Sequence, residues 1–160
     1  MTAASDRAAQ RIRAALDEQL AALGEPEWSG PGDPESLGLA CAAAVAVALG
    51  NGHTPVPGAL RAATRSLLDK LAARAPGRAV EVRVPPYAAV QCVEGPRHTR
   101  GTPPNVVEMD PVTWVLLATG RLSWTDAVAA GRVSASGPRA DLSGLLPLLR
   151  GTSSGPASLD

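Results

Sequence analysis

The stretch from Val80 to Leu149 decides the fold, and it closes with the phrase GRVSASG at residues 131–137, followed by DLSGLL at residues 141–146. The first phrase is typical of a short strand bounded by glycines, and the second of a helix with a leucine face. No catalytic constellation accompanies these phrases. We therefore expect an α+β domain that is built around an apolar interior.

Composition excludes several classes of function. The chain has 160 residues, enough for one domain with a core of useful size. Fifteen acidic residues balance fifteen basic ones, and only three Trp and one Tyr are present, so a nucleic-acid binder is not expected. The start lacks a signal-peptide pattern, and the apolar run at residues 37–49 is too short to cross a bilayer. These features predict a cytoplasmic protein.

Three helices are predicted before the first strand. Ser5 and Asp6 should cap a helix that ends near residue 23, and the pair Asp33-Pro34 should open a second one. Residues 36–49 are apolar all round, so the second helix should be buried on most sides. A third helix is expected from residue 57 or 58 to about residue 75.

The hydrophobic period then changes from helical to alternating. Val80, Val82 and Val84 alternate with charged residues, which predicts a half-buried strand. Pro85-Pro86 must end it, because proline cannot donate to a sheet ladder. A second strand at residues 88–94 should pair antiparallel with the first, since the connection is short.

The remaining elements are marked by caps and glycines. A strand is predicted at residues 105–109, then a helix opened by Asp110 and Pro111, and then a short helix with a capping box at Ser123 and Asp126. A last strand at residues 132–136 completes the sheet.

A final helix is predicted to begin at a cap on Asp141, and Pro147 should bend or shorten it. Its core-facing residues would be Leu142, Leu145, Leu146 and Leu149. We expect residues 1–150 to form a single domain, with a helical part at 1–56 and a core at 57–150. Residues 151–160 are small and polar, which predicts a disordered tail.

Three phrases in sequence order resemble the bacterial branch of the sterol-carrier-protein family: RVPPYAAVQC at residues 83–92, RHTRGTPPNVVE at residues 97–108, and the phrase at residues 131–146. The resemblance covers about residues 61–150. It implies a curved mixed or antiparallel sheet of about five strands covered by helices, with an apolar tunnel between the layers. It also implies binding of fatty acyl chains, sterols or other lipids.

The lining of such a tunnel would come from apolar residues of the strands and the following helix. The candidates are Val82, Val84, Val90, Cys92, Val106, Val107, Trp114 and Leu117. An ordinary close-packed core explains the same pattern, so both readings stay open. Arg97, His98 and Arg100 are candidates for a polar mouth that pairs with an anionic head group, and a solvated surface loop is the alternative.

Other chemistry finds little support in the sequence. The histidines and cysteines match no metal-ligand spacing, and neither a nucleophile elbow nor a glycine-rich nucleotide motif occurs, so no metal or cofactor is expected. Cys41 and Cys92 lie in apolar runs and are interpreted as small buried hydrophobes, although a disulfide between them stays open. Trp114 and Trp124 are both expected to be buried.

The leading hypothesis is a non-catalytic binding protein that carries an apolar small molecule or fatty acyl chain. The alternative is an accessory or interaction domain of a thiol-dependent isomerase or acetyltransferase system. A third reading is a structural domain whose interior is filled. The sequence leaves open whether the chain forms a homodimer or has an enzyme partner.

Overall fold

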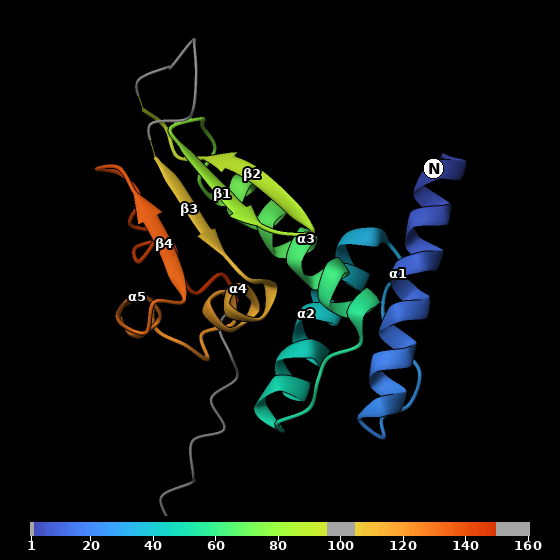
Figure 1. Ribbon diagram of the computed structural model, residues 1–160. Helices are drawn as coiled ribbons and strands as arrows, with labels where there is room; N and C mark the ends of the chain where they lie inside the picture. Colours follow the sequence, from blue (N-terminus) through green and yellow to red (C-terminus); the bar gives the residue numbers. More distant parts are fainter. Residues whose placement is uncertain (1, 96–104, 150–160) are drawn as a thin grey trace, which may run out of the picture.

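The computed structural model describes residues 2–95 and 105–149 (Figure 1). In these ranges the chain forms an α+β fold with a four-stranded sheet and five helices. The helices are α1 (Ala3–Ala22), α2 (Pro34–Gly50), α3 (Pro57–Arg74), α4 (Pro111–Ala118) and α5 (Trp124–Ala129). The strands are β1 (Val80–Val84), β2 (Ala88–Cys92), β3 (Val106–Met109) and β4 (Val133–Ser136).

The sheet is mixed, with the strand order β2-β1-β3-β4. β1 pairs antiparallel with β2, as predicted, and parallel with β3, while β3 pairs antiparallel with β4. The described residues form four strands and not about five. The residue patterns themselves predicted four, and the fifth came only from the family resemblance.

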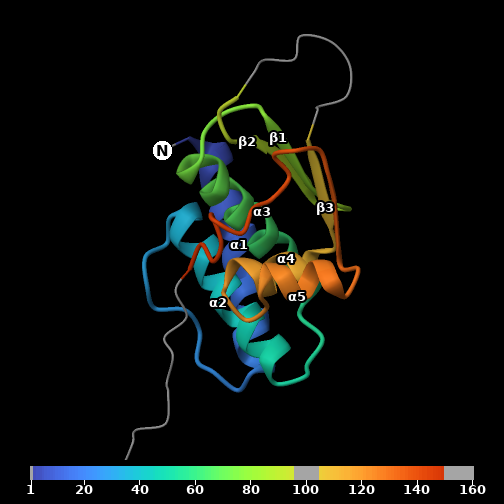
Figure 2. The same cartoon turned by 90° about the vertical axis from the view of Figure 1, so that its left-hand side faces the viewer.

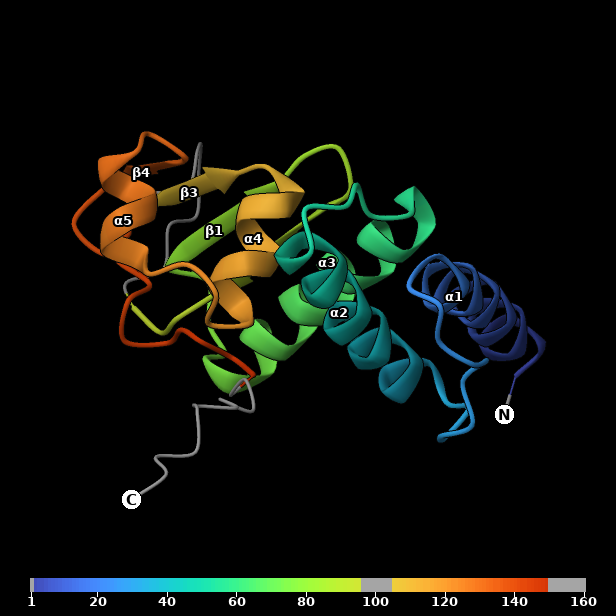
Figure 3. The same cartoon turned by 90° about the horizontal axis from the view of Figure 1, so that it is seen from below.

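α3 lies between the sheet and the first two helices (Figures 1 and 3). It packs against β2 and α4 and also against α1 and α2, whereas α1 is the helix farthest from the sheet. Figure 2 shows α4 and α5 following one another below the strands. The apolar helix at residues 37–49 therefore packs on other helices. No helix among the described residues is both long and apolar enough to span a membrane.

Side-chain caps fix most of the helix starts. Asp33, Asp110 and Ser123 each accept a hydrogen bond from the backbone N–H three residues later, as predicted. The predicted cap at Ser5 and Asp6 is wrong, because Thr2 caps α1 and its hydroxyl accepts from the Ser5 N–H. Alanine has the highest helix propensity, so residues 3 and 4 extend the helix toward the N-terminus.

β2 ends two residues earlier than predicted because the backbone turns at Val93. Val93 has a positive φ of 66°, and its N–H donates to the Ala75 carbonyl at 2.7 Å instead of continuing the ladder. Gly77 lies against this turn with φ 146°, and a Cβ there would stand 2.1 Å from the Val93 carbonyl oxygen. Only glycine fits that position.

The predicted final helix does not form. Asp141 accepts a hydrogen bond from the Ser143 N–H, which makes a local turn, and the N–H groups of Leu148 and Leu149 donate to the carbonyl of Ala118 at the end of α4. These bonds use the donors that a helix needs, and Gly144 and Pro147 disfavour it further. Leu142 is nevertheless fully buried, so the segment still contributes to the core.

The core extends through both helical layers. Its largest buried side chains include Trp114, Leu16, Leu37, Leu67, Leu68, Leu71, Leu117 and Leu142. Trp114 is buried as predicted, but Trp124 is only half-buried, which corrects the expectation for that residue. α2 is buried on most sides as predicted, and within its apolar run Ala43 and Val47 are exposed.

Candidate functional site

The inner face of the sheet brings together most of the predicted tunnel residues. The register places Val82 between Val90 on β2 and Val107 on β3, so these side chains share one face. Val84 and Cys92 fall on the same face by alternation. All of these except Val90 have no exposed surface, and Val90 is half-buried near the edge of the sheet.

Helix α4 supplies the other two predicted residues. Trp114 is fully buried, and its indole N–H donates to the carbonyl of Thr64 on α3 at 3.2 Å. Leu117 follows one turn later and is 1% exposed. The hydrogen bond satisfies the only polar group of the indole, so the ring can lie in an apolar interior at no cost in unmet hydrogen bonding.

Val106 does not join this group. It neighbours Val107 on β3, and successive side chains of a strand point to opposite faces. Its partners across the sheet are Glu81 and Ser136, which lie on the polar outer face. On that face Arg83 forms an ion pair with Glu81 at 3.1 Å.

Among the described residues, every buried side-chain nitrogen or oxygen has a hydrogen-bond partner. The two best-formed cavities of the described residues lie on the helical surface, and no strand residue lines either of them. The site predicted between the sheet and the helices is therefore distinct from both of these cavities.

The predicted polar mouth, Arg97, His98 and Arg100, lies outside the described residues. The structure does describe the backbone that flanks this segment. Asn105 is 2% exposed, its amide donates to the Ala79 carbonyl at 2.8 Å, and its side-chain oxygen accepts from the Arg139 N–H at 2.8 Å. Asn105 thus joins the starts of β1 and β3 to the segment after β4.

The thiols are free, buried and poor nucleophiles. Burial raises the pKa of the Cys41 thiol to about 12, with a smaller contribution from the negative charge of Asp17. Burial also raises the pKa of Cys92 to about 11. Both values disfavour the reactive thiolate at neutral pH, which agrees with their interpretation as buried hydrophobes. The residues in ranges 2–95 and 105–149 contain no group of three His, Cys, Asp or Glu side chains that could hold a metal ion.

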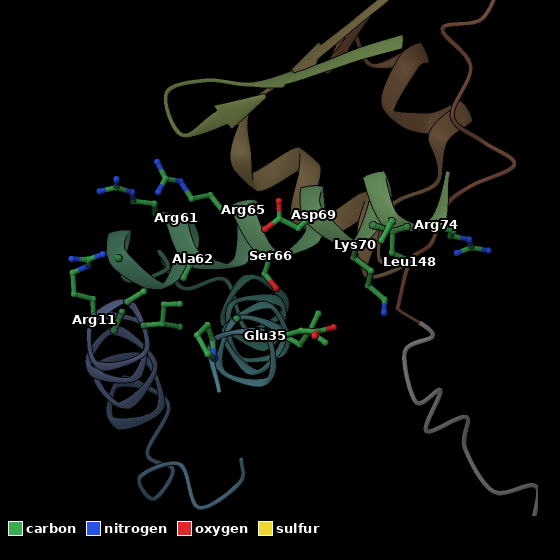
Figure 4. A pocket seen from close by; sticks show the side chains of 18 residues that line it. Arg11, Glu35, Arg61, Ala62, Arg65, Ser66, Asp69, Lys70, Arg74 and Leu148 are labelled. Atoms are coloured by element: carbon green, nitrogen blue, oxygen red, sulfur yellow. The ribbon is translucent and has the colours of Figure 1, made fainter. Parts of the chain in front are cut away.

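A large groove on the helical surface was not foreseen from the sequence. It has a volume of about 1460 Å³ and lies between α1, α2 and α3 (Figure 4). Its charged lining residues are Arg11, Glu35, Arg61, Arg65, Asp69, Lys70 and Arg74. The only available signal was the spacing of Arg61, Arg65 and Asp69, which places three charges on one face of α3.

Comparison with protein families gives a match. A family model described as "Bacterial SCP ortholog" matches residues 57–148, from the first residue of α3 to the end of the leucine-rich segment. A search of curated proteins finds no match. Helices α1 and α2 lie outside the matched region.

Proposed function

Because the chain belongs to the bacterial sterol-carrier-protein family, we propose that it binds an apolar small molecule or fatty acyl chain without changing it chemically. The proposed place is the interface between the inner face of the sheet and helices α3 and α4. The observation that carries the proposal is the family match over the residues that form this interface. The proposal includes a cytoplasmic location and requires neither metal nor cofactor.

The chemistry of the interface supports an apolar ligand. Val82, Val84, Cys92 and Val107 are fully buried and carry no side-chain nitrogen or oxygen, and Trp114 donates its N–H to α3. Each buried methylene of a guest would gain about 0.8 kcal/mol. Ordering the guest would cost part of that gain.

The segment after β2 supports a role for an anionic head group. Arg97, His98 and Arg100 belong to the segment of sequence that connects β2 to β3, and the end of β2 and the start of β3 both lie at the end of the sheet where β1 begins. Guanidinium groups bind carboxylates and phosphates through charge-assisted hydrogen bonds. We include these three residues in the proposal as the polar part of the site.

The first test is ligand binding by the full chain. We expect an apolar molecule to co-purify in native mass spectrometry, and a fluorescent fatty acid to bind with Kd below about 100 μM, equivalent to about −5.5 kcal/mol. A chain that carries no such molecule and does not bind the probe in this range would contradict the proposal and favour a structural domain with a filled interior.

A pair of variants on β2 tests the location. Val90 faces the interior and its neighbour Ala89 is exposed on the outer face, so Val90→Trp adds bulk inside while Ala89→Trp adds the same bulk outside. We expect at least tenfold weaker fatty-acid binding for Val90→Trp and unchanged binding for Ala89→Trp. Equal effects of the two changes would show that the ligand does not bind at this interface.

A second candidate function is an accessory domain of a thiol-dependent isomerase or acetyltransferase system. The observation in its favour is that α1 and α2 lie outside the family match and present additional surface. A stable complex with such an enzyme, measured by analytical ultracentrifugation of the purified components, would favour this candidate.

A further inference from the structure

The groove between α1, α2 and α3 is separate from the interface proposed for the apolar ligand. Its lining comes from the three helices and Leu148, and it includes no strand residue. Figure 4 shows the labelled lining side chains along α3, with Arg11 on α1 near the Arg61 end and Glu35 on α2 nearer to Lys70.

The floor of the groove is made of small and apolar side chains. α2 and α3 approach closely where Gly38 meets Ser66, and a Cβ at Gly38 would lie 2.6 Å from the Ser66 hydroxyl oxygen. The remaining apolar lining residues are Ala8, Ile12, Ala15, Pro34, Leu39, Ala62, Ala73 and Leu148. A surface of this kind allows a stripe of apolar side chains from another molecule to pack closely against the floor.

The walls of the groove are basic. Five basic and two acidic side chains line it, which leaves a formal excess of three positive charges in a chain whose net charge is zero. None of the five basic side chains forms an ion pair within the described part of the chain. Arg65 donates to the Tyr87 carbonyl at 3.4 Å and Arg74 to the Pro147 carbonyl at 3.1 Å, and these neutral partners leave both charges uncompensated.

The positive charges are spread along the groove and not gathered at one point. Arg61 and Arg74 are 13 residues apart on α3, or about 20 Å along the helix axis. A single carboxylate or phosphate head could neutralise only one end. The distribution therefore suits an occupant that carries several negative charges over about 20 Å.

Two extended anionic occupants fit less well. The groove has no aromatic lining residue on which bases could stack, which disfavours single-stranded nucleic acid. A planar lipid surface would touch the rim of a concave groove and leave its apolar floor uncovered. A helix of about 14 residues spans 20 Å and can present an apolar stripe and an acidic face together.

We propose that this groove is a docking site for an acidic amphipathic helix of a partner protein. The apolar stripe of that helix contacts the floor, and its acidic residues pair with Arg61 and Arg65 at one end and with Lys70 and Arg74 at the other. This is the helix-in-groove mode of recognition. Asp69 and Glu35 add two negative positions that favour a particular register of the incoming helix.

The test uses the full chain and a designed probe. The probe is a lactam-stapled peptide of 18 residues with leucines at helical i, i+4, i+7 and i+11 spacing and glutamates on the opposite face. A scrambled peptide of equal composition and a lysine-for-glutamate analogue are the controls. Fluorescence anisotropy at low salt should show at least tenfold tighter binding of the probe than of either control. Equal binding of the probe and the scrambled peptide overturns the proposal.

Charge reversal and cross-linking locate the binding. Arg61→Glu with Arg65→Glu should weaken probe binding at least tenfold, whereas the matched pair Arg78→Glu with Arg121→Glu, outside the groove, should not. Circular dichroism melting of all variants shows whether they fold. A benzophenone in the middle of the probe should cross-link to peptides that contain groove residues such as Ala62. Cross-linking elsewhere overturns the proposal.

Vesicles of phosphatidylglycerol and phosphatidylcholine serve as the competing occupant. If they displace the probe, and if the groove double variant abolishes vesicle binding, the groove is a membrane site and the helix proposal is overturned. Vesicles that leave probe binding unchanged support the protein partner. Fatty-acid binding in the same variants tests the carrier function separately, since Arg61 and Arg65 are exposed and do not belong to the buried face proposed for the ligand.

Discussion

Replacing Gly38 by alanine should destabilise the protein, although alanine is the better helix former. The new Cβ would lie 2.6 Å from the Oγ of Ser66 and 2.7 Å from its Cβ. The hydroxyl can rotate away, but the Cβ is fixed by the backbone of α3. Carbon atoms pack at about 3.5–4.0 Å, so α2 and α3 would have to separate by nearly 1 Å.

The expected magnitude follows from two opposing contributions. Overpacking a tight contact lowers the free energy of unfolding by about 1–3 kcal/mol. Alanine in place of glycine within a helix raises it by about 1 kcal/mol. We therefore expect Gly38→Ala to lower the free energy of unfolding by about 1 kcal/mol.

The sign should reverse once Ser66 is glycine. The nearest Ser66 atom that remains is the backbone Cα, 4.0 Å from the new Cβ, which is an ordinary contact. In the Ser66→Gly background, Gly38→Ala should therefore stabilise by about 1 kcal/mol. In the Ser66→Ala background the Cβ clash persists, so the substitution should still destabilise.

Urea unfolding followed by tryptophan fluorescence measures all six proteins, and the double-mutant cycle isolates the coupling. If Gly38→Ala has an effect of the same sign and size in the Ser66 and Ser66→Gly backgrounds, the close contact between Gly38 on α2 and Ser66 on α3 is refuted. If Gly38→Ala already stabilises the protein in the Ser66→Ala background, the Ser66 hydroxyl alone causes the clash.

Four further outcomes are expected. Trp114→Ala should cost about 3–5 kcal/mol in urea unfolding, because it empties a fully buried site; a loss below about 1 kcal/mol would contradict that burial. Asn105→Ala should cost about 1–3 kcal/mol in the same assay, because it leaves the Ala79 carbonyl and the Arg139 backbone N–H without their partner. An unchanged urea midpoint would contradict these two hydrogen bonds. Cys41 and Cys92 should react with Ellman's reagent at least a hundredfold more slowly in the native protein than in urea, and rapid native labelling would contradict their raised pKa values. Burial alone would raise the pKa of Asp110, but hydrogen bonds from neighbouring groups and a nearby arginine outweigh it and hold the pKa below its usual value. Its charge therefore stabilises the fold above about pH 4, and this stabilisation is lost as pH falls through the lowered pKa. The difference in unfolding free energy between the wild type and Asp110→Asn should therefore shrink in acid. A difference that stays constant with pH would contradict the lowered pKa.

Local patterns predicted the elements whose hydrogen bonds are local. The caps at Asp33, Asp110 and Ser123 and the alternation in β1 are set by neighbouring residues, so they could be identified without a structure. The final helix could not be judged in this way, because Leu148 and Leu149 donate to a carbonyl that lies thirty residues earlier.

The candidate site shows the same division. The inner face of the sheet was predicted by alternation, and the inclusion of Val106 beside Val107 was an error that alternation itself could have prevented. The groove was missed because its basic residues come from α1 and α3, which are separated by α2 in the sequence. Only the packing of the three helices reveals that these residues line one groove.

The position of α3 has a consequence for truncated forms of the chain. A fragment cut at residue 57 would retain the whole family-matched region, yet Ala59, Ala63 and the Ser66 face would lose the two N-terminal helices that now cover them. Such a fragment would expose apolar side chains of α3 to water, so it should aggregate when it is expressed alone. The smallest piece suited to recombinant work therefore begins well before the region by which relatives are recognised.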